Sequence, residues 1–424
     1  MDAPASPIST RERIATLDAV RGFALLGIFI MNIEAFHAPF FDGLAEPHHW
    51  TAWWDRAAET VKNVLFAGKF NGMFSMLFAV GFTIQLERLR ERDPEHAQAI
   101  YLRRVLWLLA FGLIHACLLW NGDVLHMYAL FGLLLIFVLH RLSDRVIFGL
   151  LILLLLYPII GNTLAAQLSD ANSMERMMKG FEELNAAQDV ALGHGTFWEA
   201  ARQNVKTQWL LYAGPWSWRT IPGWYATLGV TMLIGLLLGR HRVFQNISSY
   251  LPLVKRIQLA SLVVGVAGGT VYTAWRGTVA NPMEPTVLKA LAGLCFAISR
   301  VSIMAFYVTT IVRALHNVNW RRWLQPIVLT GRMPLTNYLL QTFIGTFVFM
   351  GWGLGHWRET GPAFDLAFAI GVFFLIQVPF SMLWLRRFER GPMEALWRKL
   401  TYWNAQGTYR TKSCGTTVSS DGNS

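Results

Sequence analysis

The chain has 424 residues, of which 54% are hydrophobic and 15% charged, with a formal net charge of +11. A soluble protein carries about a quarter charged residues, so this composition excludes an ordinary soluble domain and favours a polytopic membrane protein. Eighteen Trp and eleven Tyr agree with this, because both favour bilayer interfaces. The excess of positive charge is therefore attributed to cytoplasmic loops, and no nucleic-acid partner is expected. The three cysteines lie far apart and predict neither a disulfide framework nor a metal site.

Apolar runs predict ten membrane spans, each near the length of about twenty residues that crosses the hydrocarbon. They are expected at 19–36, 66–86, 103–120, 123–140, 146–165, 221–239, 257–275, 287–311, 327–350 and 363–385. Arg11 and Arg13 precede the first run, but no small-residue cleavage site follows it. We therefore expect a retained first span rather than a signal peptide. The predicted fold class is an all-α, polytopic membrane helical bundle.

Charge asymmetry predicts the orientation of the bundle. Arg and Lys gather in alternate loops, whereas the opposite short loops hold almost none apart from Arg358. The positive-inside rule then places both termini in the cytoplasm and the Asn121-Gly122 turn outside. We divide the chain into a five-span half at 1–165, an extracytoplasmic loop with one or two interfacial helices at 166–220, a five-span half with an inner-leaflet helix at 221–400, and a disordered tail at 401–424.

The first span opens with polar residues in "LDAVRGFALLGIFIMN". Asp18 and Arg21 are three residues apart and share a helical face. They form either an interfacial ion pair or an electropositive mouth that holds a phosphate-bearing substrate. Asn32 lies three turns further along the same helix, where it either bonds a neighbouring helix or faces a cavity.

A second polar group surrounds the turn in "GLIHACLLWNGDVLHMYALFGLLL". A tight hairpin makes the two spans antiparallel neighbours, which can bring His115 towards Asp123. His126 follows Asp123 by three residues on the same face and is a candidate for lining the substrate cavity. Asp123 is either a helix N-cap or a carboxylate that orients an imidazole as a general base.

Two further groups are candidates for lining a substrate cavity, with plainer readings as interfacial anchors or inter-helix hydrogen bonds. One lies in and after the first outer loop: His48, His49, Lys69 and Asn71. The other lies in "GRMPLTNYLLQTF", where Arg332 precedes Asn337 and Gln341, which are four residues apart on one helical face. Two adjacent histidines without further ligands do not indicate a metal site.

Several of these motifs occur in order along residues 13–400. They are "RIATLDAVRGFALLGIFIMNIEAF", "GKFNGMFSMLFAVGF", "YLRRVLWLLAFGLIHACLLWNGDVLHMYALFGLL", "GRMPLTNYLLQT" and "RRFERGPMEALWR". Through them the sequence resembles the YeiB-like bacterial inner-membrane proteins, whose C-terminal half is domain of unknown function 418. The resemblance implies a multi-pass protein of the bacterial inner membrane.

The first motif also resembles the wider group of transmembrane acyltransferases, which includes heparan-alpha-glucosaminide N-acetyltransferase and the acyltransferase-three proteins. In the latter a catalytic His stands eleven residues after the arginine that matches Arg21, a position that Asn32 holds here. The glucosaminide acetyltransferase instead carries its His in the following loop, where this chain offers His48 or His49. The YeiB-like motif offers His115, so the sequence leaves both choices of base open.

The leading hypothesis is an acyltransferase. A donor such as acyl-CoA would place its phosphates near Asp18, Arg21 and Arg332, His115 with Asp123 would act as the base towards a sugar or envelope acceptor, and Asn32 would stabilise the oxyanion. No permanently bound cofactor is expected. The alternatives are a proton-coupled carrier and a membrane scaffold without chemistry. A cavity from the Arg21 side to His115 would favour the enzyme, and a pseudo-two-fold arrangement around a midplane site would favour the carrier.

Overall fold

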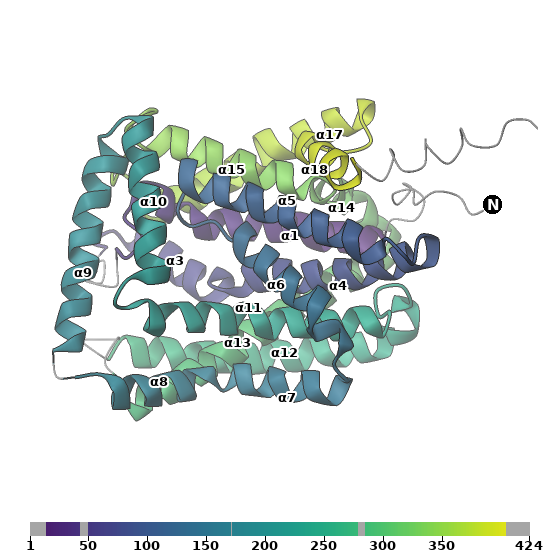
Figure 1. Cartoon of the computed structure of the whole chain (residues 1–424), viewed down its shortest axis with the longest axis horizontal. Helices are drawn as coiled ribbons and strands as arrows, with labels where there is room; N and C mark the ends of the chain where they lie inside the picture. The colour runs from purple at the N-terminus through teal and green to yellow at the C-terminus, as the bar shows by residue number, and fades with distance from the viewer. Residues whose placement is uncertain (1–13, 43–49, 171, 279–284, 404–424) are drawn as a thin grey trace, which may run out of the picture.

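The computed structural model describes residues 14–42, 50–170, 172–278 and 285–403. These residues form an all-helical bundle, as predicted (Figure 1). The N-terminal part contains α1 to α8, with α2 and α3 between the first two long helices: α1 Ala15–Asn32, α2 Glu34–His37, α3 Trp53–Val61, α4 Lys69–Arg92, α5 Ala97–Leu118, α6 Leu125–Phe137, α7 Asp144–Leu155 and α8 Tyr157–Leu168.

Two helices follow in the long predicted loop, α9 Ser173–Gln188 and α10 Phe197–Ala213. Figure 1 shows them running across one end of the bundle, while the long helices lie side by side along its length. The remaining elements are α11 Ser217–Arg240, α12 Ile247–Arg276, α13 Val287–His316, α14 Val318–Gly331, α15 Pro334–Phe349, α16 Pro362–Val372, α17 Val378–Arg387 and α18 Pro392–Tyr402. The segment 166–220, for which one or two interfacial helices are expected, thus contains α9 and α10.

The ten predicted spans each have a helical counterpart, but these differ in length. Seven of the described helices are long and apolar enough to cross a membrane, and α7 with α8 makes an eighth if that pair, bent by 52°, is one span. The other two counterparts, α6 with 13 residues and α15 with 16 residues, are shorter than the predicted spans. The predicted span at 327–350 is divided, because the chain breaks between α14 and α15 at Arg332 and Met333.

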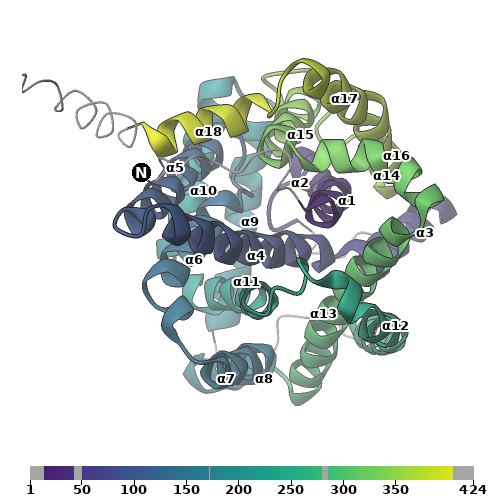
Figure 2. The ribbon, with the colours of Figure 1, turned by 90° about the vertical axis from the view of Figure 1, so that its right-hand side faces the viewer.

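Helix α1 forms the centre of the bundle, and eleven of its eighteen residues are buried. Viewed end-on in Figure 2, it is enclosed by neighbouring helices, whereas α7, α8 and α12 lie at the perimeter. Close packing is achieved through glycine: a Cβ atom at Gly331 would lie 1.8 Å from the carbonyl oxygen of Asp18. Because no side chain separates them, α14 crosses α1 directly where the polar residues of α1 begin.

The two ends of the bundle differ in composition. Ile14, just before α1, and Tyr402, at the end of α18, line one cavity, so both described ends of the chain lie together. We call this the basic end, because arginines from the predicted cytoplasmic loops gather there. We call the opposite end the α9–α10 end. Helix α18 includes Thr401 and Tyr402, so the first residues of the predicted tail are helical, and residues 404–424 lie outside the described part.

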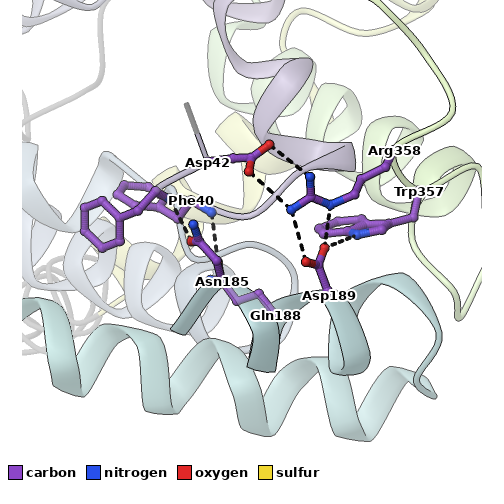
Figure 3. A network of polar contacts seen from close by, with 8 residues as sticks. Phe40, Asp42, Asn185, Gln188, Asp189, Trp357 and Arg358 are labelled. Atoms are coloured by element: carbon purple, nitrogen blue, oxygen red, sulfur yellow. Dashed lines mark hydrogen bonds and ion pairs between the residues drawn. The ribbon is translucent and has the colours of Figure 1, made fainter. Parts of the chain in front are cut away.

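An arginine clamp fastens the α9–α10 end (Figure 3). The guanidinium of Arg358 donates to both carboxylate oxygens of Asp189, at 2.7 and 3.0 Å, and to both of Asp42, at 3.2 Å. The indole of Trp357 donates to Asp189 at 2.8 Å. Arg358 has a φ of 58°, a left-handed conformation that costs about 1–3 kcal/mol outside glycine. The clamp therefore ties the loop after α2, the end of α9 and the loop before α16 together.

Candidate functional site

The α5–α6 hairpin provides the centre of the candidate site. The two helices approach so closely that a Cβ atom at Gly112 would lie 2.4 Å from the backbone nitrogen of His126. This contact sets the pairing of the helices, and it places His115 of α5 beside Asp123 of the connecting turn. Helix α10 covers the turn, where the Gln208 side chain donates to the Asn121 carbonyl at 2.6 Å.

Asp123 accepts three hydrogen bonds in a fully buried position. The Nδ1 atom of His115 lies 2.8 Å from Oδ1, and that of His126 lies 2.7 Å from Oδ2. The backbone N–H of His126 also donates to Oδ2, at 3.0 Å. Asp123 thus satisfies an amide in the first turn of α6 and orients the imidazoles as well, so both sequence-based readings of this residue describe contacts that it makes.

The hydrogen bonds also determine the tautomers of the two imidazoles. An ionised carboxylate can only accept hydrogen bonds, so both Nδ1 atoms carry the proton, and in the neutral form of each imidazole Nε2 then presents a lone pair. The Nε2 of His126 is occupied, because the Tyr212 hydroxyl donates to it at 2.6 Å. The Nε2 of His115 is buried and has no hydrogen-bond partner in the described part of the chain. An oriented imidazole with a vacant lone pair is the arrangement required of a general base.

A cavity of about 330 Å³, which we call the basic-end cavity, leads from the basic end into the bundle between α1, α4, α5, α6, α15 and α18. Two carboxylates, Asp18 and Glu394, line it together with seven arginines: Arg21, Arg88, Arg92, Arg104, Arg332, Arg390 and Arg398. The lining is therefore strongly cationic near the entrance. This sign of charge suits a phosphorylated or carboxylated ligand.

The inner part of the same cavity is apolar and approaches the histidines. Its wall includes Phe74, Phe78 and Leu108, and it extends to Val124 and Tyr338. Val124 follows Asp123 in the chain, and the centroid of the Tyr338 ring lies 5.3 Å from that of the His115 ring. The basic-end cavity therefore connects the Arg21 side of the bundle with the immediate neighbours of His115 and Asp123.

Several cavity arginines are held in place by the protein. Arg21 donates to Asp18 at 2.9 Å, which confirms the predicted pairing. The guanidinium of Arg104 lies 3.6 Å from the centroid of the Trp397 ring, and the indole of Trp397 donates to the backbone carbonyl of Arg104 at 2.9 Å. Stacking fixes a guanidinium without neutralising its charge, so Arg104 keeps its cationic character towards the cavity.

Glu394 of α18 joins the entrance of the cavity to the start of α15. It accepts hydrogen bonds from the amides of Leu335 and Thr336, at 2.7 and 3.1 Å, and from the Thr336 hydroxyl at 2.6 Å. The free amides at a helix N-terminus favour a carboxylate. Burial has the larger effect and raises the pKa of Glu394 above its usual range, although the hydrogen bonds oppose it.

The remaining predicted residues lie elsewhere. Asn337 donates to the carbonyls of Thr330 and Met333 and to the Ser381 hydroxyl, and Gln341 donates to the carbonyl of Leu25 and the side chain of Gln377. These are contacts between and within helices, and neither residue lines the basic-end cavity. Their amide nitrogens are satisfied by neighbouring backbone and side chains, as the plainer sequence-based reading expects, whereas Oδ1 of Asn337 and Oε1 of Gln341 are buried without a hydrogen-bond partner among the described residues.

Of the candidates in and after the first outer loop, the structure describes Lys69 and Asn71 of α4, and neither lines the basic-end cavity. Lys69 is 1% exposed and donates to the carbonyl of Asn63 at 3.0 Å, and the backbone of Asn71 accepts from the Tyr128 hydroxyl at 3.2 Å. Asn32 ends α1, and no hydrogen bond joins it to His115 or Asp123. The predicted candidates His48 and His49 lie outside the described residues.

A second buried histidine pair was not predicted. The Nε2 atom of His37 lies 3.0 Å from Oδ1 of Asp365, and the ammonium of Lys62 lies 3.7 Å from Oδ2 of Asp365 and 2.9 Å from Glu34. The two partners are 328 residues apart, so spacing gives no indication of the contact. A carboxylate within the apolar run at 363–385 was the one available signal, because such a residue requires a partner.

Comparisons with known proteins agree with the family resemblance. The family model described as "Protein of unknown function (DUF418)" matches residues 238–404. The chain is 30% identical over 406 residues to "Uncharacterized protein YxaH" of Bacillus subtilis, covering 93% of this chain and 96% of the relative. It is 30% identical over 399 residues to "Uncharacterized protein YeiB" of Escherichia coli, covering 92% and 96%. No solved structure matches the chain.

Proposed function

The chain belongs to the YeiB-like family of membrane proteins that carry domain of unknown function 418, and we propose that it is an integral-membrane acyltransferase of the bacterial inner membrane. In this proposal it moves an acyl group from a cytoplasmic donor such as acyl-CoA to a sugar or other envelope acceptor. The observation that carries the proposal is the basic-end cavity, which leads from clustered arginines to the neighbours of an oriented histidine.

The two parts of the cavity match the two parts of an acyl-CoA. Phosphates of the donor bind at the entrance, where Arg21, Arg104 and Arg332 contribute positive charge. The acyl chain and its thioester occupy the apolar inner part beside Phe74 and Leu108. A volume of about 330 Å³ falls at the lower end of the range of about 300–1,000 Å³ typical of ligand pockets. The adenosine part of a donor this large therefore stays near the entrance.

The proposed chemistry uses the vacant nitrogen of His115. The acceptor hydroxyl or amine attacks the thioester carbonyl while its proton passes to Nε2 of His115. The C–S bond then breaks, the acyl group remains on the acceptor, and the imidazolium returns the proton to the leaving thiolate. Asp123 keeps the imidazole in the required tautomer and stabilises its cationic form. Tyr338, beside His115 on the cavity wall, provides a hydroxyl near the developing oxyanion.

The test is direct binding of a radiolabelled acyl-CoA to the purified full chain in nanodiscs. We expect saturable binding to the wild type, a loss of at least tenfold in affinity for Arg21→Ala, and retained binding for His115→Ala. The reason is that Arg21 contributes a charged hydrogen bond to the phosphates, worth about 1.5–3 kcal/mol, whereas His115 acts only in the reaction.

Arg176→Ala is the matched control, since Arg176 is an exposed arginine of α9 that pairs with Asp170 away from the cavity. This variant should bind like the wild type. Absence of saturable acyl-CoA binding to the wild type would contradict the proposal and favour a carrier. Equal weakening in Arg21→Ala and Arg176→Ala would show only a general attraction of the anion to a basic protein.

A further inference from the structure

A second cavity lies on the other side of the bundle, between α8, α11, α12 and α13. Its volume is about 380 Å³, and we call it the lateral cavity. It shares no lining residue with the basic-end cavity. Four cations line it: Arg219, Arg276, Lys289 and Arg300. Neither Asp nor Glu occurs among its lining residues in the described part of the chain, so the cavity lacks the carboxylates found in the basic-end cavity.

Arg300 is only partly satisfied by hydrogen bonds. One of its terminal nitrogens donates to the Thr227 hydroxyl at 3.1 Å, and its guanidinium lies 5.0 Å from the centroid of the Phe296 ring. Its Nε atom is buried and has no hydrogen-bond partner among the described residues. Isolated charges within a membrane protein cost several kcal/mol unless a counter-charge is supplied. An anion in the cavity would supply it.

The local structure is shaped to hold Arg300 there. Gly68, which precedes α4, has a φ of +73°, and a Cβ atom at this position would lie 2.4 Å from Cδ of Arg300. The ammonium of Lys69, the next residue, lies 5.4 Å from the same Phe296 ring. Two cationic groups thus share one aromatic ring at the inner end of the cavity. The placement adds positive charge at a cavity that has no carboxylate among its described lining residues.

Arg219 occupies the other end of the cavity, near the start of α11. Its Nη1 atom is buried without a hydrogen-bond partner in the described residues. Arg219 and Thr227, the partner of Arg300, are eight residues apart on α11, which corresponds to about 12 Å along a helix. The cationic lining therefore extends from the α9–α10 end into the depth of the bundle, as a path along which an anionic group can be drawn inward.

The walls of the lateral cavity face the perimeter of the bundle. Helix α8 has no buried residue, and α12 buries only four of its thirty. Apolar residues such as Leu164 of α8 and Leu259 of α12 are exposed, and Figure 2 shows both helices at the edge. In a membrane these surfaces contact lipid. The nearest abundant molecules with an anionic group and apolar chains are thus the lipids around these helices.

We propose that the lateral cavity binds the phosphate headgroup of an anionic phospholipid, which enters sideways from the leaflet at the α9–α10 end. Arg219 receives the headgroup at the entrance and Arg300 binds the phosphate inside, while the acyl chains remain against α8 and α12. This inference does not depend on the proposed acyl transfer, because the two cavities are separate.

The test is titration of the purified full chain, in neutral detergent, with a fluorescently labelled phosphatidylglycerol. We expect saturable binding to the wild type and at least tenfold weaker binding for Arg300→Gln, with partial recovery in Arg300→Lys. Arg313→Gln is the matched control, since Arg313 lies on the same helix at the basic end, where it pairs with Gln258. This control should bind like the wild type.

Two competition arms distinguish the source of the phosphate. Unlabelled phosphatidylglycerol should displace the probe, whereas phosphatidylcholine, inorganic phosphate and glycerol phosphate should not. Displacement by the soluble phosphates would overturn the lipid assignment, and equal binding by the wild type and Arg300→Gln would overturn the site. If Arg300→Gln fails to fold, Arg219→Gln replaces it, and unchanged binding by that variant would equally contradict the proposal.

Discussion

The two buried His–Asp pairs resemble each other in geometry and differ in their surroundings. His115 meets Asp123 at 2.8 Å and His37 meets Asp365 at 3.0 Å. Each histidine also has one buried ring nitrogen without a hydrogen-bond partner among the described residues. The second oxygen of Asp123 accepts from another imidazole, whereas the second oxygen of Asp365 faces the ammonium of Lys62.

The comparison teaches that a histidine–carboxylate pair identifies a reactive group only when a substrate can reach it. Neither histidine itself lines the basic-end cavity or the lateral cavity. The basic-end cavity is lined by Val124 and Tyr338, which adjoin the His115–Asp123 pair, and not by Phe349 or Asp365, which adjoin His37. Asp365 also has a structural role, because its carboxylate lies beside the buried ammonium of Lys62. In the proposed function the base is therefore His115, and His37 belongs to the packing at the α9–α10 end.

The largest expected effect is on acyl-transfer activity, which should depend on His115 and not on His37. His115→Gln should lower acyl transfer by about 10²–10⁴-fold, the usual contribution of a general base, while its amide can still donate to Asp123. His37→Gln should retain transfer. The measurement is release of free CoA thiol by protein in nanodiscs supplied with envelope glycans. Equal losses in the two variants would mean that both pairs are only structural.

The next effect concerns stability at the Asp365 pair. Asp365→Asn removes the charged partner of His37 and one of the two carboxylates beside Lys62, while Glu34 still pairs with Lys62 at 2.9 Å. The loss should be about 1.5–3 kcal/mol of unfolding free energy, the usual contribution of a hydrogen bond to a charged group. Thermal unfolding in detergent gives the measurement, and Lys62→Met in the same background should recover part of the loss. Additive effects of the two substitutions in a double-mutant cycle would show that Lys62 and Asp365 are not coupled.

A smaller effect tests whether His126 takes part in catalysis. Tyr212→Phe removes the hydrogen bond donated to Nε2 of His126, and we expect about 1 kcal/mol of destabilisation. Transfer activity should be unchanged, since the vacant nitrogen of His115 is unaffected. A loss of activity comparable with that of His115→Gln would instead indicate that the base is His126, acting with its hydrogen-bond partner Tyr212.

The smallest expected effect is a pH dependence of stability, which arises from Glu394 at the entrance of the basic-end cavity. Because burial raises the pKa of Glu394 in the folded protein, the folded state holds this proton more tightly than the unfolded state. The unfolding free energy should therefore fall as pH rises from the ordinary glutamate pKa through the raised value. Glu394→Gln should flatten this part of the profile of thermal stability against pH, and an unchanged profile would contradict the assignment.

Local sequence patterns indicated that His115 and Asp123 could meet, because the Asn121-Gly122 turn is short and makes the two helices neighbours, but the contact itself is known only from the structure. The pairing of Asp18 with Arg21 was also predictable from local sequence, since residues three apart lie on one face of a helix. The apolar runs likewise predicted the segments that became helices. Each of these features depends on residues close in the chain.

Features that depend on distant residues could not be predicted in this way. His37 and Asp365 meet only because α1 with α2 packs beside α16, and no periodicity encodes that pairing. The division between α14 and α15 was not predicted, because the break at Arg332 and Met333 is short and apolar residues continue on both sides of it. Lys69 was grouped with the outer histidines by sequence order, although its side chain is close to Phe296 of α13.

The clamp at Arg358 also bears on the order in which the protein is made. Asp42 and Asp189 precede Arg358 by 316 and 169 residues, so α9 is synthesised well before its fastening is complete. If the α9–α10 end is exported as predicted, α9 and α10 lie outside the membrane without the clamp until Arg358 has been translocated. The clamp at the α9–α10 end therefore forms only after the later spans have been inserted. A chain truncated before Arg358 would lack these contacts.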